Sequence, residues 1–285
     1  MQEALSQKVS NNSTALQVNG DVHYGLSYNE VKQIFFDLFK MNFPDIQEIA
    51  KKEADARVNK LLEKIEKEFT EKKDNINKEK FKEPNIQYEM TQLTINAARF
   101  GEKSNLELLA KLFTLRLEDD CPDVIEQISG EALKILPLLS NTQLAILVVY
   151  ILSNEAELGK KDSNGKIYAK NIDILLKDTQ QYLTPVLKMK DGDIAYLQCI
   201  NCINKRVITQ LDMIPNILKN VEEFKGKTLK EVKELSVLNN FNNISTFIDF
   251  SEKCHIGNFY LSVIGRLLGW LSLQKISNID IKKLF

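Results

Sequence analysis

The chain has 285 residues, of which 44% are hydrophobic and 27% charged, so it is long enough for one large or two ordinary folded domains. Its 11 Gly and 6 Pro are too few for a disordered chain or a loop-rich all-β fold, and the expected class is mainly α. A formal net charge of −1 excludes binding to nucleic acid or to an anionic membrane through net charge alone.

The N-terminal residues carry no recognisable export signal. Residues 1–20 lack the basic head and the apolar run of a secretory signal peptide, so a cytoplasmic location is expected. Residues 14–24 alternate apolar and polar side chains around a Gly-Asp break, which predicts one or two short strands in an N-terminal tail that covers residues 1–26. The longest apolar stretch, residues 144–152, is far shorter than the ~20 residues of a membrane-spanning helix. We therefore expect no transmembrane segment.

Residues 27–83 are predicted to form a long, charged, amphipathic helical region. Ser27 and Glu30 have the spacing of a capping box, so a helix begins there and ends at Pro44, where a second helix opens. The apolar seam of this second helix is spaced like a short coiled coil, and it predicts an interface with a second copy of the chain through Val58, Leu61, Leu62, Ile65 and Phe69. The alternative is that the seam packs on its own domain, because a coiled coil needs three or four heptads.

Residues 84–204 are predicted to form a helical core domain. Its helices are expected at residues 86–100, 106–117, 122–136, 144–152, 172–189 and 194–207. Two of them should begin with capping boxes, one formed by Ser104 and Glu107 and the other by Ser140 and Gln143.

Residues 205–285 are predicted to form a winged-helix-like α+β unit. Residues 228–238 have the spacing of a helix, residues 244–250 alternate like a strand, and residues 258–260 lead through a further strand into a final helix. The Ser262 hydroxyl can cap that last helix, and Gly265 lets it approach the sheet closely.

The last helix, from Val263 to about Lys275, is apolar on most of its surface. It contains the only tryptophan, Trp270, and two glycines four residues apart, Gly265 and Gly269, which allow close contact with a neighbouring element. We expect this helix to be buried between the C-terminal unit and the helical core domain. The alternative is an exposed apolar face that binds a partner.

Two groups of residues have the composition of a metal site. Cys199 and Cys202 form a C-x-x-C pair that Cys254 and His255 could complete as ligands, or that could act as a redox dithiol. We favour buried, reduced thiols, because the pair lies in an apolar segment with no second C-x-x-C. The acidic group of Glu118, Asp119, Asp120 and Asp123 could bind a divalent ion, but it is better explained as complementing the N-terminus of the helix that opens at Pro122.

The sequence contains no recognisable catalytic motif. His23 and His255 are the only histidines, and there is no nucleophile elbow and no glycine-rich phosphate loop. We therefore expect neither an enzyme nor a cofactor. Residues 205–285 hold 12 Lys and Arg against 8 Asp and Glu, and their lysines at a spacing of three could contact nucleic-acid phosphates through Lys227, Lys230 and Lys233.

Three segments resemble bacterial helical proteins of the abortive-infection alpha type. They read SNLELLAKLFTLRLEDD, EALKILPLLSNTQLAILVVYIL and, near the end, NFYLSVIGRLLGW. Ser262 stands where those proteins usually have threonine, which keeps the hydroxyl group. The opening NGDVHYGLSYNEV is similar to the start of bacterial conflict-system proteins. The resemblance implies a cytoplasmic bacterial protein connected with defence against phage or mobile elements, and it assigns no site residues.

The expected function is therefore that of a non-enzymatic component of an abortive-infection-like defence system, acting through protein contacts. The long charged helix and the N-terminal strand favour a homo-oligomer with a further, unidentified protein partner. The alternative is a DNA-binding transcriptional regulator that uses the C-terminal winged-helix-like unit, although nucleic acid is the less expected partner because Glu231 and Glu234 lie among the lysines.

Overall fold

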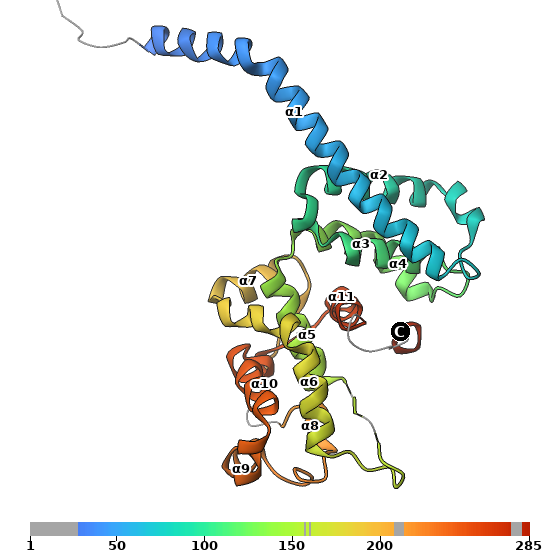
Figure 1. Ribbon diagram of the computed structural model, residues 1–285, viewed down its shortest axis with the longest axis vertical. Coiled ribbons are helices and arrows are strands. Elements are labelled where there is room, and N and C mark those ends of the chain that lie inside the picture. Colours follow the sequence, from blue (N-terminus) through green and yellow to red (C-terminus); the bar gives the residue numbers. More distant parts are fainter. Residues whose placement is uncertain (1–27, 157, 160, 208–213, 275–280) are drawn as a thin grey trace, which may run out of the picture. The chain divides into compact units, whose positions relative to one another are not determined.

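The computed structural model describes residues 28–156, 158–159, 161–207, 214–274 and 281–285 (Figure 1). These residues form eleven α-helices, seven short 3₁₀ helices and one two-stranded sheet, so the prediction of a mainly α fold is confirmed. No helix within these ranges is long and apolar enough to cross a membrane. The predicted strands at residues 14–24 and the capping serine, Ser27, lie outside the described residues.

The chain divides into two compact units, with the boundary between Lys52 and Glu53 inside helix α1 (Tyr28–Glu71). In the first unit the helix continues through Pro44, so the prediction that this proline ends it is wrong. A proline removes one backbone hydrogen bond and crowds the preceding turn, at a cost of about 3 kcal/mol. An ion pair between Lys52 and Glu48, at 2.8 Å, joins adjacent turns of the helix in this unit.

In the second unit, residues 53–71 of α1 place the predicted apolar seam against the core of that same unit. Leu61 is only 1% exposed, and three further seam residues pack partly buried against the core: Val58, Ile65 and Phe69. Leu62 faces outward and is 52% exposed. The predicted intermolecular seam is therefore corrected to an internal one at four of its five positions, because helices of the same unit already cover it.

Three helices follow α1 in the second unit and pack on one another (Figure 1). They are α2 (Pro84–Phe100), α3 (Leu106–Leu117) and α4 (Asp123–Ile135), preceded by the 3₁₀ helix η1 (Lys78–Lys82). Arg57 of α1 donates hydrogen bonds to the carbonyl oxygens of Ala98 at 3.1 Å and Arg99 at 2.9 Å. The last carbonyls of a helix lack partners within it, so this cation stabilises the end of α2 and joins it to α1.

The start of α3 corrects the predicted capping box of Ser104 and Glu107. Ser104 is the last residue of a 3₁₀ turn, η2 (Gly101–Ser104), and therefore does not occupy the capping position. Asn105 precedes the helix instead, in a left-handed conformation with φ of 55°, and its side chain does not cap the helix. The Asn105 amide nitrogen donates to the carbonyl oxygen of Leu139 at 3.0 Å. This tertiary contact fixes the orientation of the amide.

Helix α5 (Asn141–Asn154) lies in the centre of the core, and its predicted capping box is confirmed. The Gln143 backbone N–H donates to Ser140 Oγ at 3.2 Å, and the Ser140 N–H donates to Gln143 Oε1 at 2.9 Å. Residues 143–153 are all buried, because neighbouring helices cover α5 on every side.

Helix α6 (Ala169–Leu183) packs beside α5 and leads through η4 (Thr184–Lys188) to α7 (Asp191–Cys199). The predicted helix at residues 194–207 is wrong beyond Cys199. Asn201 adopts a left-handed conformation with φ of 56°, which ends the helix, and the chain then enters strand β1 (Ile203–Lys205).

The last part of the described chain contains short helices around a two-stranded sheet. Its elements are α8 (Asn216–Lys219), α9 (Leu229–Glu234), η5 (Ser236–Asn240), α10 (Asn242–Lys253), η6 (Ile256–Asn258), β2 (Phe259–Leu261), α11 (Val263–Leu273) and η7 (Ile281–Leu284). Earlier in the chain, η3 (Leu136–Leu138) follows α4 directly. Strand β2 pairs antiparallel with β1, with Ile203 opposite Leu261.

The predicted strand at residues 244–250 is wrong, because these residues lie in α10. Ile244, Phe247 and Ile248 are buried, and their spacing of three and four residues is that of one helical face. The apparent alternation in this short segment fits both periods. Helices α8, α9 and α10 separate the two strands of the sheet along the chain, and the predicted winged-helix order is not present in the described residues.

Helix α11 confirms the predictions made for the end of the chain. Ser262 Oγ accepts a hydrogen bond from the Gly265 N–H at 3.1 Å and so caps the helix. Gly265 lies directly against the backbone of Cys202, and Gly269 lies against Ile151 of α5. Most of the helix is buried, including Trp270, which is 3% exposed.

Candidate functional site

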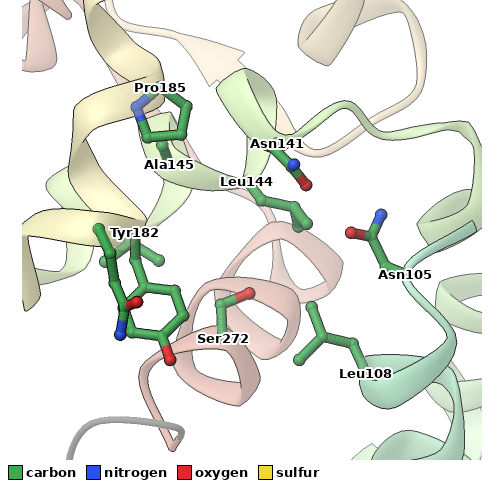
Figure 2. Close-up of a pocket in the computed structure, with 10 residues that line it drawn as sticks. Asn105, Leu108, Asn141, Leu144, Ala145, Tyr182, Pro185 and Ser272 are labelled. Atoms are coloured by element: carbon green, nitrogen blue, oxygen red, sulfur yellow. The ribbon is translucent and has the colours of Figure 1, made fainter. Parts of the chain in front are cut away.

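A pocket of about 300 Å³ opens in the second unit, between α5, α6 and α11 and beside the start of α3 (Figure 2). Half of its lining is apolar and consists of Leu108, Leu144, Ala145, Val148 and Pro185. The other half carries amide or hydroxyl groups and consists of Asn105, Asn141, Gln181, Tyr182 and Ser272. This composition, an apolar wall with a few polar groups, is typical of small-molecule sites.

Local structure explains how two amides reach this pocket. Asn105 Nδ2 donates to the carbonyl oxygens of Leu139 at 3.0 Å and Leu136 at 3.5 Å, and no hydrogen bond to its Oδ1 is formed among the described residues. Asn141 is the first residue of α5, but the neighbouring residues Ser140 and Gln143 form the capping box, so its amide is not used by the helix. Figure 2 shows these two amides turned toward each other at one side of the pocket.

The opposite side of the pocket is formed by α6 and α11. Tyr182 lies near the end of α6, half-buried, with its ring along the pocket. Ser272 of α11 donates its hydroxyl to the carbonyl oxygen of Leu268 at 2.8 Å, so its oxygen can still accept a hydrogen bond from a ligand.

None of the ten lining residues carries a charge at neutral pH. Among these ten described residues there is thus no carboxylate, imidazole or thiol that could hold a metal ion or transfer a proton. What this arrangement can do is bind an uncharged molecule through apolar contacts and several hydrogen bonds.

A second, more open cavity of about 610 Å³ lies beside the first, and Asn141 lines both. It is bordered by Phe100, Pro137, Leu138, Leu139, Ser140 and two charged residues, Glu102 and Lys103. Glu102 also lies 3.5 Å from Lys60 of α1. Charge is thus present next to the first pocket and absent from its lining.

The acidic group after α3 binds lysines of the same unit. Glu118 is 2% exposed, and its carboxylate pairs with Lys72 at 2.7 Å and with Lys282 of η7. Lys282 also pairs with Asp120 at 2.5 Å, and this hydrogen bond lowers the pKa of Asp120. The group therefore joins the turn after α1, the segment after α3 and η7, and of its four residues only Asp123 occupies the first turn of α4 as predicted.

A second cluster of charges surrounds Arg116, which is 6% exposed. Glu126 Oε1 accepts from Arg116 at 2.5 Å and from Lys80 at 2.8 Å. The hydrogen bond from Lys80 is the main cause that lowers the pKa of Glu126. Within the described part of the chain, neither Arg116 Nε nor Oε2 of the neighbouring buried carboxylate, Glu89, has a hydrogen-bond partner.

Replacing Glu89 with glutamine is expected to raise the free energy of unfolding near neutral pH by about 1 kcal/mol. Burial raises the pKa of Glu89 above 4.5, so ionising this group costs more in the folded chain than in the unfolded chain. When the pKa of a carboxyl group is higher in the folded chain than in the unfolded chain, the folded chain loses stability as the pH rises through the pKa of the folded state. Below the pKa of the unfolded state the group is protonated in both states, and this loss is absent. The advantage of E89Q should therefore shrink as the pH falls toward 4.5. Calorimetric melting across this range tests the expectation, which an advantage that grows in acid would contradict.

The structure does not bring the predicted metal ligands together. Cys199 and His255 are exposed, whereas Cys202 and Cys254 are buried. Burial raises the pKa of both buried thiols to about 12, so they are protonated at neutral pH. Within the described ranges, no group of three or more His, Cys, Asp or Glu side chains has the geometry to hold a metal ion.

The three lysines predicted for nucleic acid lie on and beside α9. Lys227 and Lys230 are exposed. Lys233 is paired with both carboxylate oxygens of Glu252 in α10, each at 2.9 Å. Part of the predicted basic face is thus neutralised within the chain.

Comparisons with known proteins add one relationship. Searches of curated proteins and of solved structures each give no significant match. A family model described only as ":-like" matches residues 25–236. This match covers well over half of the chain, which therefore belongs to that family.

Proposed function

We propose that this protein is a non-enzymatic component of a bacterial anti-phage or conflict system of the abortive-infection type, and that it works by binding. The family description names no activity, so the defence role is supported by the resemblance of the helical segments. The observation that carries the non-enzymatic part is the chemistry of the pocket, whose lining offers hydrogen bonds and apolar contacts but no ionised group.

Phage plating tests the defence role. Cells that express the gene together with its neighbouring genes should lower the plating efficiency of at least one phage in a panel by about 10-fold or more. A variant that disrupts the fold, Gly265→Leu, should restore plating, because its side chain would clash with the Cys202 backbone. The substitution Gly192→Ala, which has open space around it, is the matched control and should protect as the wild type does. Unchanged plating of every phage on the wild-type set would contradict the proposal.

The proposal includes a homo-oligomer, and Leu62 is the seam residue whose side chain remains exposed. Light scattering after size exclusion should give a mass of at least twice 32.7 kDa. Leu62→Glu should reduce that mass, because a carboxylate at an apolar contact must lose its water. Lys67→Gln changes the charge by the same amount on an exposed part of α1 and should leave the mass unchanged. A strict monomer at high protein concentration would exclude the oligomer.

The DNA-binding alternative stays a prediction with less support. The strand at residues 244–250 on which the winged-helix order depended is a helix, and Lys233 pairs with Glu252. Binding to duplex DNA would support this alternative if it depended on salt and became weaker in a variant with Lys227 and Lys230 changed to Glu.

A further inference from the structure

We propose that the pocket between α5, α6 and α11 binds a neutral, flat heterocycle of the nucleobase class, as the free base or the nucleoside. This inference goes beyond the proposed defence role and does not depend on it. It is carried by three properties of the pocket, which are its size, the placement of its polar groups and its lack of charge.

The size of the pocket suits a small ligand. Its volume of about 300 Å³ lies at the lower end of the range for small-molecule sites, about 300–1,000 Å³. The apolar wall from α5 consists of Leu144, Ala145 and Val148, and Tyr182 adds an aromatic surface on the α6 side (Figure 2). Aromatic rings bind the faces of other flat rings by offset stacking.

The polar groups suit the edge of a heterocycle, which alternates hydrogen-bond donors and acceptors. The Asn105 amide is oriented by its contact with the Leu139 carbonyl and presents an oxygen that accepts. Asn141 has both a donor and an acceptor that no side-chain hydrogen bond occupies in the described part of the chain. Amides in this arrangement recognise adenine and similar bases by paired hydrogen bonds. An aliphatic ligand would leave these groups unpaired, at a cost in affinity.

The lack of charge distinguishes a base or nucleoside from a nucleotide. A phosphate group in this pocket would meet no lysine or arginine among the ten lining residues, and the first turn of α5, which Asn141 begins, offers it only backbone N–H groups. Burying an unpaired anion is costly, so the added phosphate of a nucleotide should not strengthen binding. Among its described lining residues, the neighbouring cavity has one lysine, Lys103, and one carboxylate, Glu102, so these residues give it no net positive charge that would attract an anion.

Titration of the full chain with adenosine, guanosine, cytidine and uridine tests this inference by calorimetry and saturation-transfer NMR. At least one nucleoside should bind with a Kd below about 100 µM. Asn141→Ala should weaken that binding by about 5-fold or more, and Ala145→Leu, which fills the pocket, by about 10-fold or more. Asn240→Ala, an exposed asparagine outside the pocket, should bind as the wild type does.

Three results would overturn the inference. The first is no binding of any nucleoside or free base at about 1 mM. The second is a monophosphate that binds at least 10-fold more tightly than its nucleoside. The third is unchanged binding by Asn141→Ala, whose substitution at an exposed position should leave the fold intact. Each of these results concerns ligand binding alone, so it is distinguishable from a failure of the phage-plating test.

Discussion

Gly265→Ala is expected to lower the free energy of unfolding by about 3 kcal/mol and the melting temperature by about 6–12 °C. A Cβ atom at this position would lie 1.9 Å from the carbonyl oxygen of Cys202 and 2.8 Å from its carbonyl carbon. Both are backbone atoms, so no rotation of a side chain can relieve the clash. Helix α11 would have to move away from the start of β1, and its contacts with α5 would be lost with it.

Gly192→Ala provides the matched control for this substitution. Gly192 lies in the first turn of α7, and a Cβ atom added there meets nothing within 4 Å. Alanine is the better helix former by about 1 kcal/mol, so this variant should be as stable as the wild type or slightly more stable. Equal melting temperatures for G265A and G192A, measured by calorimetry, would show that α11 does not approach the backbone of Cys202 so closely.

Trp270→Ala is expected to lower the free energy of unfolding by about 3–5 kcal/mol. Trp270 is 3% exposed, and its removal would leave a large cavity in the core. The indole N–H also donates to Glu155 Oε2 at 3.0 Å, and this oxygen accepts from Arg266 Nε at 2.7 Å. The substitution therefore removes apolar contacts and one member of a hydrogen-bonded group that joins α11 to the end of α5.

Trp270→Phe separates these two contributions, because phenylalanine keeps most of the ring and lacks the indole N–H. We expect a loss of about 1–2 kcal/mol for this variant, of which the missing hydrogen bond accounts for about 1 kcal/mol. Since Trp270 is the only tryptophan, melting should be followed by circular dichroism or calorimetry. If alanine and phenylalanine cost the same, the cavity is not the main cause of the loss.

Two correct predictions rest on a local interaction or on a position where only one residue type fits. The capping box of Ser140 and Gln143 spans one helical turn, and the residues that form it are adjacent in the chain. The two glycines of α11 were likewise recognisable, because a residue without a side chain in an apolar helix indicates close approach to a neighbour.

Two of the wrong predictions concern segments whose structure depends on distant partners. Residues 244–250 fit a strand and a helix equally well by their apolar spacing, and burial against α6 and α5 selected the helix. Strand β1 pairs with residues more than fifty positions later, and nothing near residue 203 in the sequence indicates that partner.

The pocket was not predicted because its residues are scattered along the chain. Asn105, Asn141 and Ser272 come from three separate helix regions, and each is an ordinary residue type at a helix end or on a helix face. The one available signal was that Asn141 follows Ser140, the capping residue, so its own side chain was not needed to start α5. The sequence thus indicates that the Asn141 amide is not needed for capping, but it does not indicate which residues that amide faces.

The position of α11 has a consequence for how the protein is made. The hydrogen bonds from Arg266 and Trp270 to Glu155 join residues 111 and 115 positions apart, so the last helix completes a core whose other walls are synthesised much earlier. Such long-range contacts slow folding, because the chain must close a large loop before they form. Until the ribosome has released α11, the apolar surface of α5 that it covers is open to other chains. Nascent copies of this protein should therefore depend on chaperones until α11 has emerged and packed against α5.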